Sequence, residues 1–190
     1  MAEVKELPAQ RTPPNFLTRA DAGRFLAGIE DPDKRRFVAA ALATGRRIGE
    51  LIGLRWERVD LNRGRYLVVK SKNHLTRSYP INSTFRAVLV STGPEASGPV
   101  WPRWTDRRYV SRWIKAELVK AGFPNLRAHD LRHSYASIQA MAGRSLQEIK
   151  ELLGHSQIST TLIYAHLTPD HLAEAAEIQL GPIDLEGKTK

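Results

Sequence analysis

The sequence lacks cysteine altogether, since none of its 190 residues carries a thiol. This absence excludes disulfide bonds and thiolate metal sites, and it fits a protein of the reducing cytoplasm. Long apolar runs are also missing, because no stretch approaches the roughly 18 residues that span a bilayer. The N-terminal segment MAEVKELPAQRTPP has no apolar core and does not resemble a signal peptide. Together these absences predict a cytoplasmic protein with no membrane partner.

Acidic residues are fewer than basic ones. The chain has 20 Asp and Glu against 29 Lys and Arg, which gives a formal net charge of +9 at pH 7. Such an excess of positive charge attracts the phosphate backbone of nucleic acids. RNA or an anionic membrane surface would attract the same charge, so this observation indicates only a polyanionic partner.

The length predicts one domain with short tails. Residues 1–16 are rich in proline and are expected to form a flexible leader. The folded domain is expected to extend over 17–180, with a last amphipathic helix at 169–180 and a flexible tail at 181–190. The chain shows no internal repeat and no low-complexity tract.

Hydrophobic periodicity changes twice along the chain. Apolar residues recur at helical spacing before residue 55, alternate as in strands between 59 and 81, and then return to helical spacing. Because no βα units alternate, the pattern predicts a mainly α protein with a small antiparallel β-sheet, of the α+β class. The expected helices begin at Thr18 and continue with 37–44, 46–54, 83–90, 107–121, 128–141, 145–153, 159–165 and 169–180.

Arg47 and Glu50 form the first candidate pair. They lie three residues apart, so on a helix they share a face. A carboxylate beside a guanidinium fixes its orientation, which bidentate phosphate recognition requires. The alternative is a surface ion pair worth about 0–1 kcal/mol. Spacing does not choose between Arg47 and Arg46, which precedes Glu50 by four residues.

A hairpin supplies the second candidate. Lys70 and Lys72 lie on the same face of the expected strand, so alternation does not distinguish them. A lysine near the turn at Asn73-His74 can reach a phosphate or donate a proton to a leaving oxygen. The alternative is a solvated lysine that protects a sheet edge.

His129 and Arg132 repeat the i, i+3 spacing near the start of an expected helix. A helix N-terminus favours anions, and histidine is the side chain that exchanges protons near neutral pH. His133 follows Arg132 and is expected to point elsewhere, as a buried or supporting group.

His155 and Tyr164 complete the set. Gly154 is expected to end the preceding helix, which places His155 on a turn where its side chain can point into a cleft. Tyr164 comes nine residues later, in an expected short helix where a tyrosine is usually packing. Tyr135 is predicted to belong to the core.

In this order the motifs resemble those of the tyrosine recombinase, or phage integrase, family. The resemblance covers about residues 17–178, and its first motif selects Arg47 over Arg46. The hairpin motif selects Lys72, with Lys70 as the fallback because the turn carries His74-Leu75. The matching segments are TGRRIGEL at 44–51, SKN at 71–73, RSYPI at 77–81, HDLRH at 129–133, and LGH at 153–155 followed by Thr161 and Tyr164.

Two departures from the family accompany these matches. Arg46 adds a second arginine to the first motif, where it is expected to be able to contact DNA. The family normally carries a helical DNA-clamping domain of about a hundred residues before this one. Only some sixteen residues precede the first expected helix here, so we expect a catalytic domain alone, without the N-terminal core-DNA-binding domain.

The resemblance implies the DNA breaking-rejoining fold and a site-specific recombinase that acts on double-stranded DNA. Such an enzyme proceeds through a 3′-phosphotyrosine intermediate in DNA integration or excision, without metal, ATP or another cofactor. It also implies a homotetramer on DNA for the full-length protein, and a monomer for the isolated domain. Helix 169–180 would dock on a neighbouring subunit or fold back on its own. The implied roles are nucleophile for Tyr164, phosphate binding for Arg47, Arg132 and His155, proton transfer for His129, general acid for Lys72, and orientation of Arg47 for Glu50.

Three alternatives accompany this interpretation. A type IB topoisomerase has a closely related site but relaxes supercoils as a monomer. A non-catalytic DNA-binding regulator would retain the fold without the activity, which the intact set of candidate residues argues against. A histidine metal site is disfavoured because the chain has no cysteine and no H-E-x-x-H pattern.

Overall fold

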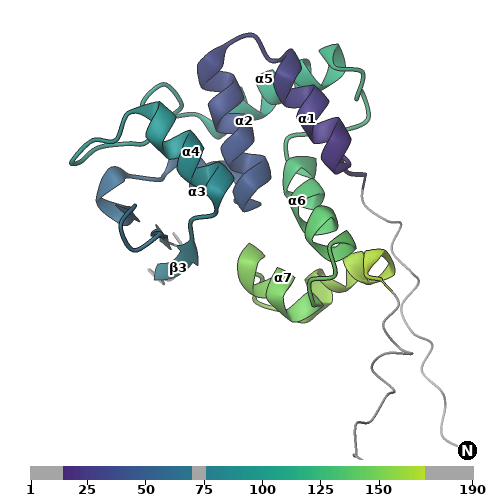
Figure 1. Ribbon diagram of the computed structural model, residues 1–190. Coiled ribbons are helices and arrows are strands. Elements are labelled where there is room, and N and C mark those ends of the chain that lie inside the picture. Colours follow the sequence, from purple (N-terminus) through teal and green to yellow (C-terminus); the bar gives the residue numbers. More distant parts are fainter. Residues whose placement is uncertain (1–14, 70–75, 170–190) are drawn as a thin grey trace, which may run out of the picture.

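The protein is mainly helical, with one small sheet set against the helices (Figure 1). The computed structural model describes residues 15–69 and 76–169. The leader before residue 15, the hairpin lysines and residues 170–180 of the expected last helix lie outside the described residues. Among the described helices, none is long and apolar enough to cross a membrane. The elements are α1 Arg19–Gly28, α2 Pro32–Thr44, α3 Ile48–Ile52, η1 Trp56–Arg58, β1 Val59–Asp60, β2 Arg65–Val69, β3 Thr76–Pro80, α4 Ser83–Thr92, α5 Arg107–Lys120, α6 Asp130–Met141, α7 Leu146–Leu153, η2 Ile158–Thr160 and η3 Leu162–Leu167.

The sheet is antiparallel with strand order β1-β2-β3. Tyr66 pairs with Tyr79 across β2 and β3, and the last described pair of the hairpin is Val69 with Thr76. Tyr66 and Tyr79 alternate with exposed neighbours and point into the core. This confirms the predicted mainly α fold with a small antiparallel sheet.

Local signals explain most helix ends. Ser145 and Glu148 form a capping box that starts α7, as their spacing indicates. Gly154 ends α7 in the left-handed conformation, as predicted. Asp31 caps α2 through two backbone amides, which starts this helix several residues before the expected Phe37.

Two further expected helices differ from the structure. The expected helix 46–54 is only Ile48–Ile52, because Arg47 is extended with ψ of 145° and serves as the N-cap. The expected α-helix 159–165 is instead a pair of 3₁₀ turns, η2 and η3. A 3₁₀ turn winds more tightly and is common in short connecting segments.

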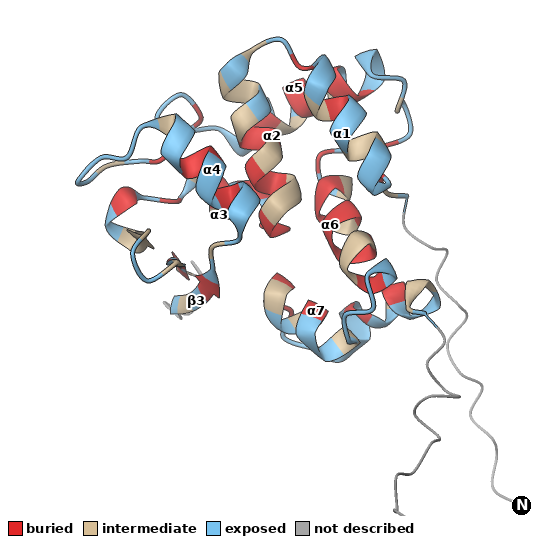
Figure 2. Ribbon diagram, in the orientation of Figure 1, coloured by how far each residue is buried: buried red, intermediate tan, exposed pale blue. Residues whose placement is uncertain are grey.

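The core has two parts. The larger part joins α1 to α5 and the sheet, and it contains Phe37 in edge-on contact with Trp101 and Trp113. The smaller part lies between α6, α7 and η3, where Tyr135 and Tyr164 pack with aliphatic side chains. Figure 2 shows that the buried faces of α2 and α6 turn toward the interior. Tyr135 is therefore a core residue, as predicted.

Gly45 is the point where the two parts of the core meet. Its φ of 61° is left-handed, and an added Cβ would lie 2.4 Å from Cδ1 of Tyr135 and 2.9 Å from Cδ2 of Leu153. We expect Gly45→Ala to lower the free energy of unfolding by about 2–4 kcal/mol, from backbone strain and overpacking. Urea denaturation measures this loss. Gly23→Ala, in α1 with nothing within 4 Å of the added Cβ, is the control and should not destabilise the protein.

Candidate active site

Arg47 lies at the start of α3 and is exposed. Its Nη1 donates to Oε1 of Glu50 at 2.8 Å, while its backbone amide donates to Oε2 of the same carboxylate at 3.1 Å. Burial by itself raises the pKa of the Glu50 carboxyl, but Arg46 and Arg47 overcome this and hold the pKa below its usual value. Glu50 is therefore an anion that fixes the orientation of an exposed arginine.

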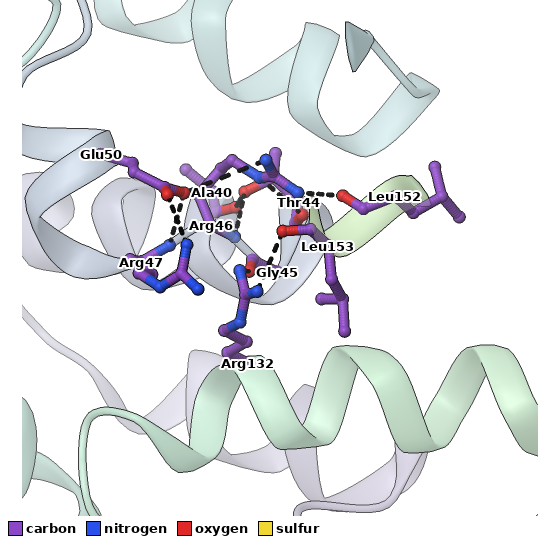
Figure 3. A network of polar contacts seen from close by, with 9 residues as sticks. All are labelled: Ala40, Thr44, Gly45, Arg46, Arg47, Glu50, Arg132, Leu152 and Leu153. Carbon is purple, nitrogen blue, oxygen red and sulfur yellow. Dashed lines mark hydrogen bonds and ion pairs between the residues drawn. The ribbon is translucent and has the colours of Figure 1, made fainter. Parts of the chain in front are cut away.

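Arg46 is buried, with only 2% of its surface exposed. Its guanidinium lies over the Tyr79 ring at 3.8 Å from the centroid, and its Nη2 donates to the carbonyl of Leu152. The expectation that Arg46 contacts DNA is therefore wrong, because the side chain is enclosed between β3 and the end of α7. Figure 3 shows it turned away from Arg47.

Arg132 comes from α6 and connects two distant segments. It is 4% exposed, and it donates from Nη1 to the carbonyl of Gly45 at 2.8 Å and from Nη2 to the carbonyl of Leu153 at 2.9 Å (Figure 3). Burial, followed by repulsion from Arg47 and Arg46, lowers the pKa of Arg132 to about 10. The guanidinium therefore stays charged at neutral pH.

The end of α7 explains why two arginines gather there. The last carbonyls of a helix have no partner within the helix and carry partial negative charge. Leu152 and Leu153 provide two such carbonyls, and Arg46 and Arg132 each donate to one of them. The turn that follows α7 is thus held by arginines from two other parts of the chain.

His155 lies on this turn and is 8% exposed. Its Nδ1 is 3.0 Å from Oγ1 of the fully buried Thr161. Burial, followed by the charges of Arg132 and Arg47, lowers the pKa of His155 to about 4. The imidazole is therefore neutral at pH 7, and its bond to Thr161 fixes the direction in which the ring points.

Tyr164, in η3, is the most enclosed of the predicted residues, with 1% of its surface exposed. Its Oη lies 2.7 Å from Nδ1 of His133. Burial raises the pKa of Tyr164 to about 12, although the charge of Arg132 opposes this rise. The phenol is therefore protonated at neutral pH.

His133 does not point elsewhere, as the sequence had suggested, but contacts Tyr164 directly. It lies four residues after His129, and its ring is edge-on to that of His129 with centroids 5.1 Å apart. This i, i+4 spacing places both rings on one side of α6, and it is the signal that would have found the contact. His129 itself occupies the N-cap position of α6, and burial, followed by Arg132, lowers the pKa of His129.

Lys72 and its fallback Lys70 lie outside the described residues. Within the described ranges, no group of three His, Asp or Glu side chains is arranged to hold a metal ion. A cavity of about 600 Å³ between β3 and α7 is lined by Tyr66, Tyr79 and Tyr135 among others. It contains none of the predicted catalytic residues.

The geometry thus brings together side chains from four segments. Arg47 precedes α3, His129 and Arg132 belong to the start of α6, His155 follows α7, and Tyr164 lies in η3. Arg132 lies close enough to influence the pKa of both His155 and Tyr164. The cluster therefore combines two permanent cations, neutral imidazoles and one phenol, which together suit attack on a phosphodiester.

Comparison with known proteins identifies relatives of this chain. The model of the phage integrase family matches residues 15–171. The integrase of Escherichia phage P2 is 32% identical over 181 residues, covering 95% of this chain and 50% of the phage protein. Tyrosine recombinase XerA of Thermococcus kodakarensis is 36% identical over 186 residues, covering 92% of this chain and 66% of that protein. The chain thus spans half to two thirds of these relatives.

Solved structures with the same fold include the catalytic domain of bacteriophage HP1 integrase. That domain has a TM-score of 0.69 and 30% identity, and the match covers 84% of this chain and 92% of the HP1 chain. XerA recombinase has a TM-score of 0.70 and 26% identity, over 89% of this chain and 65% of XerA. The chain belongs to the phage integrase family of tyrosine recombinases, and it has the fold of their catalytic domain.

Proposed function

We propose that this chain cleaves and rejoins double-stranded DNA as the catalytic domain of a site-specific recombinase. The observation that carries the proposal is the meeting of Arg47, Arg132, His155 and Tyr164 at one place, from segments far apart in the sequence. The net charge of +9 favours a nucleic-acid partner.

The two arginines would bind the scissile phosphate. During attack, negative charge develops on the non-bridging oxygens, and forked hydrogen bonds from guanidinium groups stabilise it. Arg47 is exposed, and its Nη1 donates to Oε1 of Glu50 at 2.8 Å. The neutral His155 would add a hydrogen bond to the phosphate from the nitrogen that does not face Thr161.

Tyr164 would be the nucleophile. Its attack forms a 3′-phosphotyrosine and releases a 5′-hydroxyl, and the covalent bond preserves the energy needed for rejoining. Because Tyr164 is 1% exposed, DNA binding has to open a path to Oη.

Proton transfers complete the proposed reaction. Lys72, with Lys70 as its alternative, would protonate the departing 5′ oxygen, and His129 is the residue that the family resemblance offers for taking the phenol proton of Tyr164. Glu50 would act on Arg47 by orienting it. No metal or ATP takes part in this scheme.

The partner and assembly follow the same proposal. Proteins of this fold include a lambda integrase tetramer bound to a Holliday junction, although its 17% identity shows the fold alone. We propose a homotetramer on DNA for the longer protein and a monomer for this chain in isolation. Residues 169–180 would dock on a neighbour or in cis, and size-exclusion chromatography at several concentrations tells these apart.

A covalent trapping experiment tests the function. The chain is incubated with duplexes that are randomised around a nick, so that cleavage releases a short strand and religation cannot occur. Adducts that survive SDS are isolated and their DNA is sequenced. We expect adducts enriched in one sequence, with the protein attached at a 3′ phosphate. Absence of any adduct contradicts the proposal, and relaxation of supercoiled plasmid without sequence preference would favour a type IB topoisomerase.

A further inference from the structure

We propose that His133 is a catalytic residue, the base that takes the proton from Tyr164 during cleavage and returns it during rejoining. This inference rests on the proposed function and assigns to His133 a role that the family resemblance places on His129. The observation is the contact of 2.7 Å between Nδ1 of His133 and Oη of Tyr164. A base must lie within about 2.6–3.2 Å of the group it deprotonates.

The other two histidines of the site, His129 and His155, have neighbours other than Oη of Tyr164. Nδ1 of His155 faces Oγ1 of Thr161 at 3.0 Å. His129 lies edge-on to His133 with ring centroids 5.1 Å apart. Among the described residues, His133 is the one side chain that hydrogen-bonds Oη of Tyr164.

The phenol needs a base within the protein. Tyr164 is 1% exposed, so bulk hydroxide does not reach Oη in this arrangement. Burial also raises the pKa of Tyr164 to about 12, so spontaneous ionisation at pH 7 leaves only a very small fraction of phenolate.

His133 is in the protonation state that a base requires. Burial, followed by the neighbouring His129, lowers the pKa of His133 below 6.5, while Asp130 opposes this and Arg132 adds to it. His155 lies close enough for His133 to influence the pKa of His155. With its pKa lowered, His133 is neutral at pH 7, and its capacity to accept a proton is lost only as the pH falls below that lowered value.

Atoms and charges balance in this step. The O–H bond of Tyr164 breaks and an N–H bond forms on Nδ1 of His133. Oη forms a bond to phosphorus, the bond from phosphorus to the 5′ oxygen breaks, and that oxygen takes a proton from the general acid proposed above. The reverse sequence religates the DNA and returns the proton to Oη.

Arg132 and His133 are adjacent on α6, so contacts that fix one of them also restrain the other. Arg132 is fixed by the carbonyls of Gly45 and Leu153, so the backbone that carries His133 is fixed as well. The helix therefore holds the proposed phosphate-binding group, Arg132, and the proposed proton acceptor, His133, in fixed positions relative to each other.

Three variants of the full chain test the proposal. His133→Asn keeps a side-chain oxygen near the position of Nδ1, which accepts the phenol hydrogen bond but cannot take the proton. His133→Ala removes both functions, and His129→Asn is the matched control on the same face of α6. Each is assayed by single-turnover adduct formation on the nicked duplex selected by the wild-type chain, from pH 5 to pH 9, with and without added imidazole.

We expect His133→Asn to form adducts at least about a hundredfold more slowly than wild type at pH 7. Imidazole should restore adduct formation to His133→Ala and not to His129→Asn. A His133→Asn rate within threefold of wild type at every pH overturns the proposal, and so does imidazole rescue of His129→Asn alone. A faster rate in His133→Asn or His133→Ala overturns it too, because His133 would then be a tether that keeps Tyr164 buried.

Two measurements keep the result distinct from misfolding and from failure of the proposed function. Circular dichroism and duplex binding by fluorescence anisotropy should match wild type in the Asn variants. If the wild-type chain itself forms no adduct, the proposed function fails. If the wild-type chain does form adducts, comparing the His133 variants with His129→Asn tests only whether His133 is the base.

Discussion

Tyr164→Phe will bind DNA as tightly as the wild-type chain and form no covalent adduct. The substitution removes only Oη, and the phenyl ring fills the same site in the small core between α6, α7 and η3. The lost hydrogen bond to His133 changes the free energy of unfolding by only about 0.5–1.5 kcal/mol. Adducts are measured on SDS gels, and affinity is measured by fluorescence anisotropy.

Tyr135→Phe is the matched control for this loss. Tyr135 lies in the same part of the core and is 7% exposed, but it faces Gly45 rather than the histidines. The Tyr135→Phe variant should form adducts at close to the wild-type rate. Adducts that persist in Tyr164→Phe would show that another residue attacks the DNA.

Arg132→Ala should lose both activity and stability. Removing one charged donor to a transition-state oxyanion costs about 2.7–4 kcal/mol, or a hundredfold to a thousandfold in rate. The carbonyls of Gly45 and Leu153 also lose their partner, and each unsatisfied buried group costs about 1–3 kcal/mol. Single-turnover rates are measured well below the melting temperature, and stability is measured by urea denaturation.

Arg47→Ala separates these two effects. Arg47 is exposed, and Glu50 is its side-chain partner among the described residues. We therefore expect Arg47→Ala to lower the rate by a similar factor and to lower the free energy of unfolding by less than about 1 kcal/mol. Arg127→Ala, an exposed arginine shortly before α6, should change neither. A loss of rate below tenfold for Arg132→Ala in the folded protein would contradict its assigned role.

Residue spacing alone could not decide which of the two neighbouring arginines, Arg46 or Arg47, belongs to the site. Arg46 and Arg47 both fit a helical pairing with Glu50, and only the family resemblance chose Arg47. The structure supplies the physical reason, because the extended N-cap conformation at Arg47 directs the two side chains apart. Arg46 enters the interior against Tyr79, and Arg47 stays at the surface.

His133 shows where inference from the sequence failed. Its place beside Arg132 suggested a supporting role, because adjacent residues on a helix point in different directions. The relevant neighbour was Tyr164, which lies 31 residues later and meets His133 only through the packing of η3 on α6. The 3₁₀ conformation of η3 escaped prediction for a related reason, since a short apolar pattern suits both kinds of helix.

The sequence by itself determined the elements, most of their ends, and the chemical groups of the site. These depend on local periodicity, capping and turn residues, which act between near neighbours. Only the tertiary structure decided that Arg46 and Arg132 would bind carbonyls 106 and 21 residues away, and that Tyr164 would be buried against His133. Contacts of that range depend on how helices pack, because a buried charge or phenol takes the hydrogen-bond partner that the completed fold places within reach.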